Sequence, residues 1–366
     1  MSASRLASRA RVLPRAAANR WLRARRRPSD PRRILIAHHL LTGDVLMLAP
    51  LLAKLCERYP QADVAMTVRQ PIAALFSGRP YGARPIVYDP RDPETLNALF
   101  QEPAFDLALV PGDNRYSWLA AAAGARWIVA FAGDRPAYKS WPVDEEIPYS
   151  SQPAAWPDMV AGMIEGAPPA PYGPGDWPAP PFAPFEQPQG RYAVLHVQAS
   201  TPLRHWEPPK WLALAEHLSA KGIVPIWSAA PTGEDLLRSI DPSERFQALG
   251  HRLDLAQLWQ LVSRATLLVC PDTSVAHIGK LASAPTVVLY GPSSAELFGR
   301  GEFWRHAPFA EVTVRDFPCR DQQTLFKRKI EWVRRCQRST DECAEPRCMQ
   351  GIQVEQVLAA VAALGV

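Results

Sequence analysis

The sequence contains no long apolar run, although hydrophobic residues make up 47% of its 366 residues. A helix that crosses a bilayer needs about 20 consecutive apolar residues, so no transmembrane helix is expected. The first residues also lack the continuous apolar segment of a secretory signal peptide. We therefore expect a soluble, cytoplasmic protein, and its length favours two domains.

Most of the chain has no excess of basic residues, although the net charge of the whole sequence is +5. Residues 1–33 contain eleven Arg and one Asp, which gives +10 and leaves −5 for the remainder. A nucleic-acid-binding domain is usually basic, so nucleic acid is not an expected partner. Residues 1–33 are predicted to be a flexible leader. Their few apolar side chains among arginines also fit an amphipathic segment that lies on an anionic membrane surface.

The six cysteines include no Cys-x-x-Cys pair. Two of them, Cys56 and Cys270, fall within apolar runs and are expected to be buried thiols. The other four lie near the C-terminus, at positions Cys319, Cys336, Cys343 and Cys348. In a reducing cytosol these four would either hold a structural metal ion or remain free thiols rather than form disulfides.

Short apolar runs alternate with helical patterns, which predicts parallel sheets covered on both faces. A helix is predicted over residues 45–59, with Pro50 either kinking it or marking its start. The fold class is therefore α/β, with two Rossmann-like doubly wound domains that face a central cleft. The predicted parts are the leader 1–33, an N-terminal domain 34–164, a Pro-rich linker 165–190, a C-terminal domain 191–351 and a terminal helix 352–366.

The most informative stretch, residues 265–294, is predicted to fold as strand, helix and strand. Asp272 and Thr273 separate the first strand from the helix that begins at Ser274. A helix start at the carboxyl edge of a parallel sheet offers free N–H groups that suit a phosphate. His277 lies on the first turn and could point into the same crevice. The alternative is that Asp272, Thr273 and Ser274 only cap the helix and that His277 is a packed surface residue.

Three other polar turns follow predicted strands. Asp44 follows the first strand and could act as a general base or cap a helix. Ser200, Thr201 and Arg204 could bind a diphosphate, since guanidinium groups pair well with phosphate oxygens. Glu234 could accept hydrogen bonds from sugar or ribose hydroxyls, or merely favour a helix start. Three of the four polar turns thus lie in the second domain. This asymmetry favours a donor substrate held by the second domain and an acceptor substrate served by Asp44.

Two segments resemble signatures of glycosyltransferase family 9, the ADP-heptose:lipopolysaccharide heptosyltransferases. The first is residues 43–60, GDVLMLAPLLAKLCERYP, and the second is residues 270–294, CPDTSVAHIGKLASAPTVVLYGPSS. In order of elements the resemblance extends over about 34–365. It implies a GT-B fold and inverting sugar transfer from a nucleotide-diphospho-sugar, with an ADP-sugar favoured and no cofactor or catalytic metal required. It also implies a glycan, glycolipid or protein acceptor, at the inner-membrane surface.

The resemblance also suggests roles for individual residues. Asp44 matches the general base, and Glu234 matches an acid near the nucleoside, with Asp235 as its rival. Residues that match the donor and phosphate ligands are Ser200, Thr201, Arg204, Asp272, Thr273, Ser274 and His277. Ser274 stands where these heptosyltransferases usually carry Gly, and cysteine-rich tails in some relatives bind iron. Two alternatives are a nucleotide-sugar epimerase or hydrolase of the same fold, and a non-catalytic, metal-stabilised binding protein.

Overall fold

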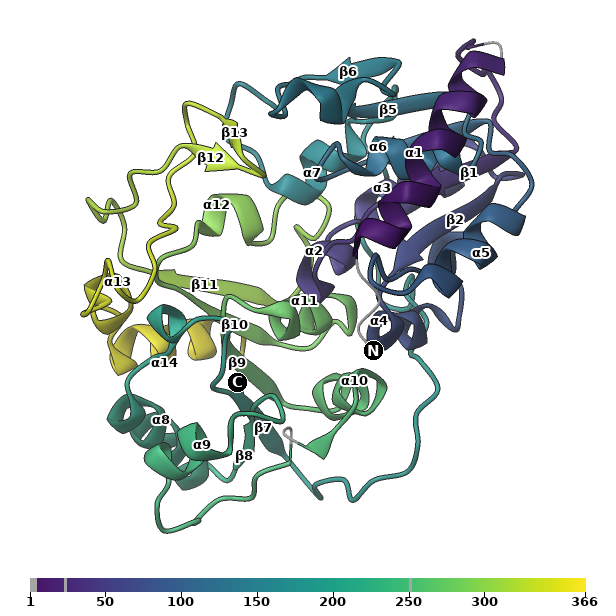
Figure 1. The fold of residues 1–366 in the computed structure, drawn as a ribbon. Helices are drawn as coiled ribbons and strands as arrows, with labels where there is room; N and C mark the ends of the chain where they lie inside the picture. The colour runs from purple at the N-terminus through teal and green to yellow at the C-terminus, as the bar shows by residue number, and fades with distance from the viewer. Residues whose placement is uncertain (1–4, 23–24, 250–251) are drawn as a thin grey trace. The chain divides into compact units, whose positions relative to one another are not determined.

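The computed structural model describes residues 5–22, 25–249 and 252–366. The chain folds into two compact units (Figure 1). Unit 1 comprises residues 1–152, 157–170 and 324–331, and unit 2 comprises 153–156, 171–323 and 332–366. Each unit is built around one parallel sheet, so the predicted α/β class with two doubly wound domains is confirmed.

The sheet of unit 1 has the strand order β3-β2-β1-β4-β5-β6, and all its pairs are parallel. Its strands are β1 (Arg33–Ile36), β2 (Asp63–Val68), β3 (Arg84–Val87), β4 (Leu107–Val110), β5 (Trp127–Phe131) and β6 (Glu145–Ile147). The first five coincide with the short apolar runs of the sequence, whereas β6 is short and partly exposed and has no such run. The strand order reverses between β1 and β4, and such a switch point is where open α/β sheets bind ligands.

Helices cover both faces of this sheet. The helix predicted over 45–59 is divided into α2 (Thr42–Leu46) and α3 (Ala49–Arg58), and Pro50 lies in the first turn of α3. Proline there costs no hydrogen bond, because the first N–H groups of a helix have no partner within it. The remaining helices are α4 (Gln70–Ala73), α5 (Pro93–Gln101), α6 (Tyr116–Ala122) and α7 (Trp156–Ala161).

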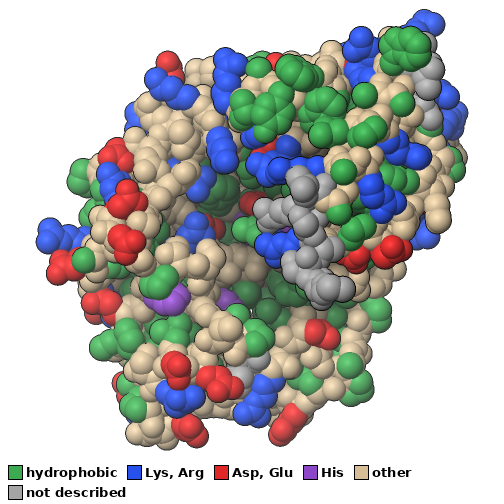
Figure 2. All heavy atoms as spheres, viewed as in Figure 1, with side chains coloured by type: hydrophobic (Ala, Val, Ile, Leu, Met, Phe, Trp, Pro, Cys, Tyr) green, Lys and Arg blue, Asp and Glu red, His purple; other side chains and the backbone are tan. Residues whose placement is uncertain are grey.

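The N-terminal segment differs from the expected flexible leader, because α1 (Arg5–Leu22) packs against α5 and α6. Val12 and Ala16 are buried in the same core as the strands of unit 1. Arg15 Nε donates to the carbonyl of Ala122 at 2.8 Å, so the last turn of α6 gains a hydrogen-bond donor. Residues 1–4 and 23–24 of the predicted leader lie outside the described residues. Figure 2 shows Lys and Arg side chains concentrated on this part of unit 1.

The sheet of unit 2 has the order β11-β10-β9-β7-β8 and is also parallel throughout. Its strands are β7 (Tyr192–His196), β8 (Val224–Ser228), β9 (Leu267–Pro271), β10 (Thr286–Tyr290) and β11 (Phe309–Thr313). The order reverses between β7 and β9, which places the switch point of unit 2 beside the loops that follow these two strands. β7, β9 and β10 are buried along their whole length, as expected for strands covered on both faces.

One face of this sheet carries α8 (Pro208–Ala220), α9 (Glu234–Ile240) and α14 (Val354–Ala363), whose apolar side chains join its core. The other face carries α10 (Leu255–Ser263) and α11 (Ser274–Leu281) (Figure 1). α11 lies close against the sheet at Gly279, where an added Cβ would stand 2.4 Å from Thr286 Oγ1. Only glycine therefore fits this contact without a shift of its neighbours.

The remaining segments connect these parts. Residues 165–190 contain neither helix nor strand in the described chain. A short hairpin, β12 (Thr324–Leu325) with β13 (Arg328–Lys329), belongs to unit 1 although it lies between segments of unit 2 in the sequence. Two further short helices are α12 (Ala295–Phe298) and α13 (Arg347–Gln350). No helix among the described residues is long and apolar enough to cross a membrane.

Candidate active site

The loops after β7 and β9 meet at the switch point of unit 2. Arg204 Nη1 donates to the carbonyl oxygen of Asp272 at 2.9 Å and lies 3.3 Å from its carboxylate. The Asp272 side chain is buried, whereas the Arg204 side chain is 23% exposed. Two predicted site residues that are far apart in sequence are therefore in direct contact. Part of the Arg204 charge is already balanced by Asp272.

The start of α11 has no side-chain cap. Thr273 is the N-cap residue, but its side chain makes no capping hydrogen bond. Asp272 is occupied by Arg204 instead. The simple capping role considered for Asp272 and Thr273 is therefore not seen here. The Ala276 N–H donates to the Thr273 carbonyl at 3.1 Å, and the N–H groups that precede it in the first turn could donate to an anion. Ser274 is the first helical residue and is partly buried.

His277 lies on the first turn of α11 but is only 4% exposed. Its Nδ1 has no hydrogen-bond partner within the described part of the protein. Burial lowers the pKa of His277 well below its usual value, and the nearby positive charge of Lys280 lowers it further. His277 is therefore a neutral imidazole, which can exchange hydrogen bonds but adds no positive charge for a phosphate.

The hydroxyls after β7 differ in their surroundings. Ser200 is exposed, whereas the Thr201 hydroxyl accepts from the Leu203 N–H at 3.4 Å at the start of a short 3-10 turn. Gln198 connects this loop to the next one, because its side-chain oxygen accepts from the Ala230 N–H at 2.8 Å. The loop that carries the two hydroxyls and Arg204 is therefore tied to the ends of β8 and β9.

Glu234 opens α9 and lines a cavity of about 340 Å³ in unit 2. The apolar part of its wall includes Trp227 and Phe246, and the polar part includes Arg238. The Glu234 carboxylate is 59% exposed and lies 3.6 Å from Arg238. Its rival Asp235 is 93% exposed and is not part of the cavity wall. Of the two acids, Glu234 is therefore the one that lines this open pocket.

Asp44 stands in the first turn of α2, in the segment that follows β1 at the switch point of unit 1. The N-cap position of α2 is Leu41, and no side-chain capping hydrogen bond is made there. Asp44 is partly buried. Its position at the carboxyl edge of the sheet agrees with the prediction, whereas its chemical role is not tested by these contacts.

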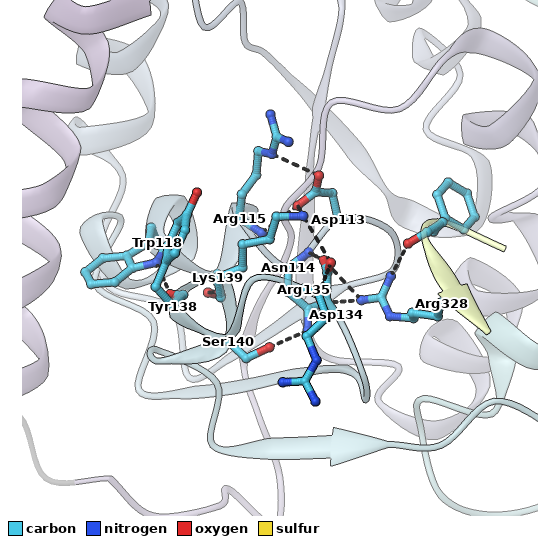
Figure 3. Close-up of polar contacts among 12 residues, drawn as sticks. Asp113, Asn114, Arg115, Trp118, Asp134, Arg135, Tyr138, Lys139, Ser140 and Arg328 are labelled. Atoms are coloured by element: carbon cyan, nitrogen blue, oxygen red, sulfur yellow. Dashed lines mark hydrogen bonds and ion pairs between the residues drawn. The ribbon is translucent and has the colours of Figure 1, made fainter. Parts of the chain in front are cut away.

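A buried ionic cluster at the ends of β4 and β5 was not predicted (Figure 3). Asp134 lies 3.0 Å from Lys139 and 3.5 Å from Arg328. All three side chains are at most 4% exposed. Asn114 is fully buried among them, accepts from Arg328 at 2.6 Å and donates to the Phe131 carbonyl at 2.9 Å.

Asp113 forms the outer edge of this cluster, 3.1 Å from Lys139 and 2.9 Å from Arg115. Burial raises the pKa of Asp113, but the Arg115 N–H and the two cations outweigh that effect and lower it below its usual value. The repeated Gly-Asp pair, Gly112-Asp113 and Gly133-Asp134, is a sequence signal for the two carboxylates of the cluster. No local signal pointed to Arg328, which is 214 residues from Asn114.

The four C-terminal cysteines are free thiols. Burial raises the pKa of Cys348 to about 11, and the neighbouring Cys319, Cys336 and Cys343 contribute to this shift. The thiols are thus near one another, but metal binding needs thiolates in a defined shell. Among the described residues, which include all four cysteines, no three His, Cys, Asp or Glu side chains are placed to hold a metal ion. In this geometry the cysteines do not fit a metal site.

Comparisons with known proteins agree with this fold. Residues 175–331 match the family model of glycosyltransferase family 9 (heptosyltransferase). The lipopolysaccharide heptosyltransferase 3 of Escherichia coli is 25% identical over 137 residues, which cover 36% of this chain and 40% of that protein. The lipopolysaccharide heptosyltransferase 1 of Pseudomonas aeruginosa is 27% identical over 154 residues, covering 39% and 43%. The chain thus matches less than half the length of these curated relatives.

The likeness in structure is more extensive. The solved structure of E. coli ADP-heptose lipopolysaccharide heptosyltransferase II has a TM-score of 0.65 to this chain at 15% identity, covering 92% of this chain and 100% of that one. The two parallel sheets and this likeness show the class of fold, which is GT-B. Within this class the predicted resemblance to glycosyltransferase family 9 is confirmed, and with it the relationship to enzymes that transfer sugars.

Proposed function

We propose that this protein is an inverting glycosyltransferase that moves a heptose or related sugar from a nucleotide-diphospho-sugar to a bacterial surface-glycan or lipopolysaccharide acceptor. One observation carries the proposal: Arg204 and Asp272 meet at the switch point of unit 2, beside the uncapped start of α11. A guanidinium and free helix N–H groups at one place form a site for a diphosphate. The names of the two curated relatives support lipopolysaccharide as the acceptor class.

In this proposal unit 2 holds the donor. The diphosphate would accept hydrogen bonds from Arg204, from Ser200 and Thr201, and from the N–H groups at Thr273 and Ser274. The neutral His277 would hydrogen-bond to the donor without adding charge. Glu234 would accept from the ribose hydroxyls, with the nucleoside in the adjacent cavity. An ADP-sugar is the favoured donor, because the solved heptosyltransferase II is described as acting with ADP-heptose.

Asp44 would serve the acceptor. In a single displacement the acceptor oxygen forms a bond to the anomeric carbon while the bond from that carbon to the diphosphate breaks. The acceptor proton would pass to the Asp44 carboxylate, and the negative charge that develops on the diphosphate would be stabilised by Arg204 and the α11 amides. This step uses one base and one anion site and inverts the anomeric configuration.

The cellular location and a possible metal ion at the cysteines are two further parts of the proposal. A lipopolysaccharide precursor is assembled on a membrane, so we place the enzyme in the cytoplasm, peripheral to the inner membrane. No metal is assigned to the transfer step. A structural Zn or Fe ion at the cysteine cluster remains a hypothesis, supported by the proximity of the thiols and opposed by their present geometry. Metal analysis of the purified protein would test it.

The donor assignment can be tested by thermal shift. The full-length protein is heated with ADP-, UDP-, GDP- or dTDP-sugars, since a ligand that binds only the folded form raises the unfolding temperature. We expect an ADP-sugar to give the largest shift. At about 100 times its dissociation constant, it would add about 2.7 kcal/mol of stability. Arg204→Gln is expected to abolish most of that shift.

Arg191→Gln is the matched control, because Arg191 directly precedes β7 at the opposite end of the strand from the Arg204 loop. The quantity compared is the ligand-induced shift, because Arg204→Gln also removes the contact to Asp272 and changes the unliganded protein. If no nucleotide-sugar shifts the midpoint, or if Arg204→Gln retains the full shift, the proposed donor site is wrong. Release of a free sugar or an epimer in place of transfer would favour the alternative enzymes.

A further inference from the structure

Unit 1 exposes large apolar side chains on its outer surface. Six such side chains are exposed among the described residues: Leu13, Trp21, Leu41, Tyr138, Trp141 and Val224. Four of them belong to two neighbouring segments of unit 1, namely α1 and residues 138–141. Trp21 is 87% exposed and Trp141 is 70% exposed. Exposed tryptophans gathered in one place, rather than scattered singly, indicate an interaction surface.

The aromatic side chains of residues 138–141 form a cluster with Trp118 of α6. The ring centroid of Trp141 lies 6.4 Å from that of Trp118 and 6.5 Å from that of Tyr138. Trp118 Nε1 donates to the Tyr138 carbonyl at 2.9 Å (Figure 3). The Ser117 hydroxyl donates to the Lys139 carbonyl at 2.7 Å. The backbone under the exposed rings is therefore held in place, and the rings are presented without a large ordering cost on binding.

α1 adds a second apolar stripe and a high positive charge. Val12 and Ala16 point into the core, whereas Leu13, Ala17 and Trp21, spaced four residues apart, are exposed. Residues at this spacing lie along one side of a helix. The sequence of α1, RLASRARVLPRAAANRWL, contains five Arg and no Asp or Glu. The helix is thus cationic with an uncovered apolar stripe.

An ion pair joins the two segments. Arg20, at the end of α1, donates to Asp144 at 2.9 Å, three residues after Trp141. The nearby acids are matched by cations: Asp144 by Arg20 and Arg25, and Glu145 by Arg27 at 3.4 Å. Figure 2 shows hydrophobic side chains on this face of unit 1 with Lys and Arg side chains around them. We call Leu13, Trp21, Trp118, Tyr138 and Trp141, together with the exposed Arg9, Arg11 and Arg15, the aromatic–arginine face.

We propose that the aromatic–arginine face docks unit 1 onto the surface of an anionic phospholipid bilayer. Tryptophan and tyrosine rings favour the boundary between headgroups and acyl chains, and arginines favour anionic headgroups. A second copy of the chain is a poorer occupant, because a two-fold contact through this face would bring one Arg-rich α1 near the other. The face would hold the protein on the membrane without any spanning segment.

The test is co-sedimentation of the full-length protein with vesicles. Vesicles of phosphatidylcholine alone are compared with vesicles that also contain phosphatidylglycerol, at low and high salt. We expect binding to the anionic vesicles that weakens with salt. Trp21→Ser combined with Trp141→Ser is expected to reduce partitioning about tenfold or more, since two large apolar contacts are lost. Val224→Ser, an exposed apolar residue of unit 2, is the matched control and should leave binding unchanged.

A second measurement avoids any dependence on variant folding. Brominated phosphatidylglycerol should quench part of the tryptophan fluorescence of the unaltered protein, because the exposed rings would lie among the lipids. The proposal is overturned if the protein binds neither vesicle, or if the double variant binds as well as the parent. It is also overturned if light scattering shows a dimer that only the double variant disrupts. The inference rests on the membrane setting given in the proposed function. None of these assays needs sugar transfer, so their failure would remove that membrane setting but leave the donor site and the transfer step untouched.

Discussion

Among single residues, Asp44 carries the sharpest chemical assignment. It lies in the first turn of α2, directly after the central strand β1, and the N-cap position of that helix belongs to Leu41. In the proposed mechanism this carboxylate, at the carboxyl edge of the sheet, accepts the proton of the acceptor hydroxyl.

Asp44→Asn keeps the size of the side chain and removes the base. We expect turnover to fall by about 10²- to 10⁴-fold, the usual contribution of a general base, whereas the donor-induced thermal shift should be unchanged. The measurements are the rate of sugar transfer and the donor-induced shift in unfolding temperature. Asp30→Asn is the control, because Asp30 is 60% exposed and pairs with Arg32 at 2.8 Å. Near-normal turnover of Asp44→Asn would remove this residue from the mechanism.

Among elements, the β12–β13 hairpin has the least expected position. Its two turn residues, Phe326 and Lys327, have φ values of 45° and 65°, a region that side-chain-bearing residues adopt at a cost. Arg328 anchors the hairpin, donating to the Ala132 carbonyl at 3.0 Å and to Asn114, near the carboxylate of Asp134. The anchor in unit 1 thus offsets the strain in the turn.

Arg328→Met tests this anchor. The substitution removes one of the two cations beside the buried Asp134 and the donor to Asn114. We expect a loss of roughly 3 kcal/mol in the free energy of unfolding of unit 1. The measurement is urea unfolding of the full-length protein. Lys329→Met, one residue away and exposed, should change stability by less than about 0.5 kcal/mol. Equal stability of the two variants would show that the Arg328 contacts contribute little.

For the whole molecule, buried neutral histidines predict sensitivity to acid. Burial lowers the pKa of His38 in unit 1 to about 3, lowers that of His196 in unit 2 to about 4, and places that of His277 well below its usual value. Below about pH 6.5 the unfolded chain binds protons at these positions and the folded chain does not. Acid therefore favours unfolding, and the stability present at neutral pH is lost as the pH falls.

Between pH 7.5 and 5.5, His38 and His196 should each cost about 1.4 kcal/mol of folding free energy, and His277 acts in the same direction. Urea unfolding at the two pH values measures the loss. His196→Gln should reduce the pH dependence of unit 2 by about one such increment, because it removes one titrating group. A free energy of unfolding that is the same at both pH values would contradict the prediction.

The sequence predicted the parts of this molecule that are local, and the structure supplied those that are not. β9, α11 and β10 were predictable because an apolar strand, a polar turn and a helical pattern follow one another within thirty residues. The contact between Arg204 and Asp272 was not predictable, since it depends on β7 and β9 being neighbours in the sheet. β6 was missed because it is short and lies at the sheet edge, with little apolar pattern.

The same distinction explains the N-terminus and the ionic cluster. The leader was predicted to be flexible because its composition is dominated by arginine, but α6 offers α1 an apolar surface and carbonyl acceptors. The Gly-Asp pairs after β4 and β5 could have drawn attention to Asp113 and Asp134, whereas Arg328 arrives from the far end of the chain.

The late position of residues 324–331 in the sequence has a consequence for biosynthesis. Unit 1 receives its last segment only after most of unit 2 has left the ribosome, because that segment lies beyond β11. Until then the nascent protein contains Asn114 and Asp134 without the guanidinium that contacts them both. A messenger RNA truncated before the codons for residues 324–331 would therefore yield an incomplete unit 1, even if the codons for residues 1–152 were intact.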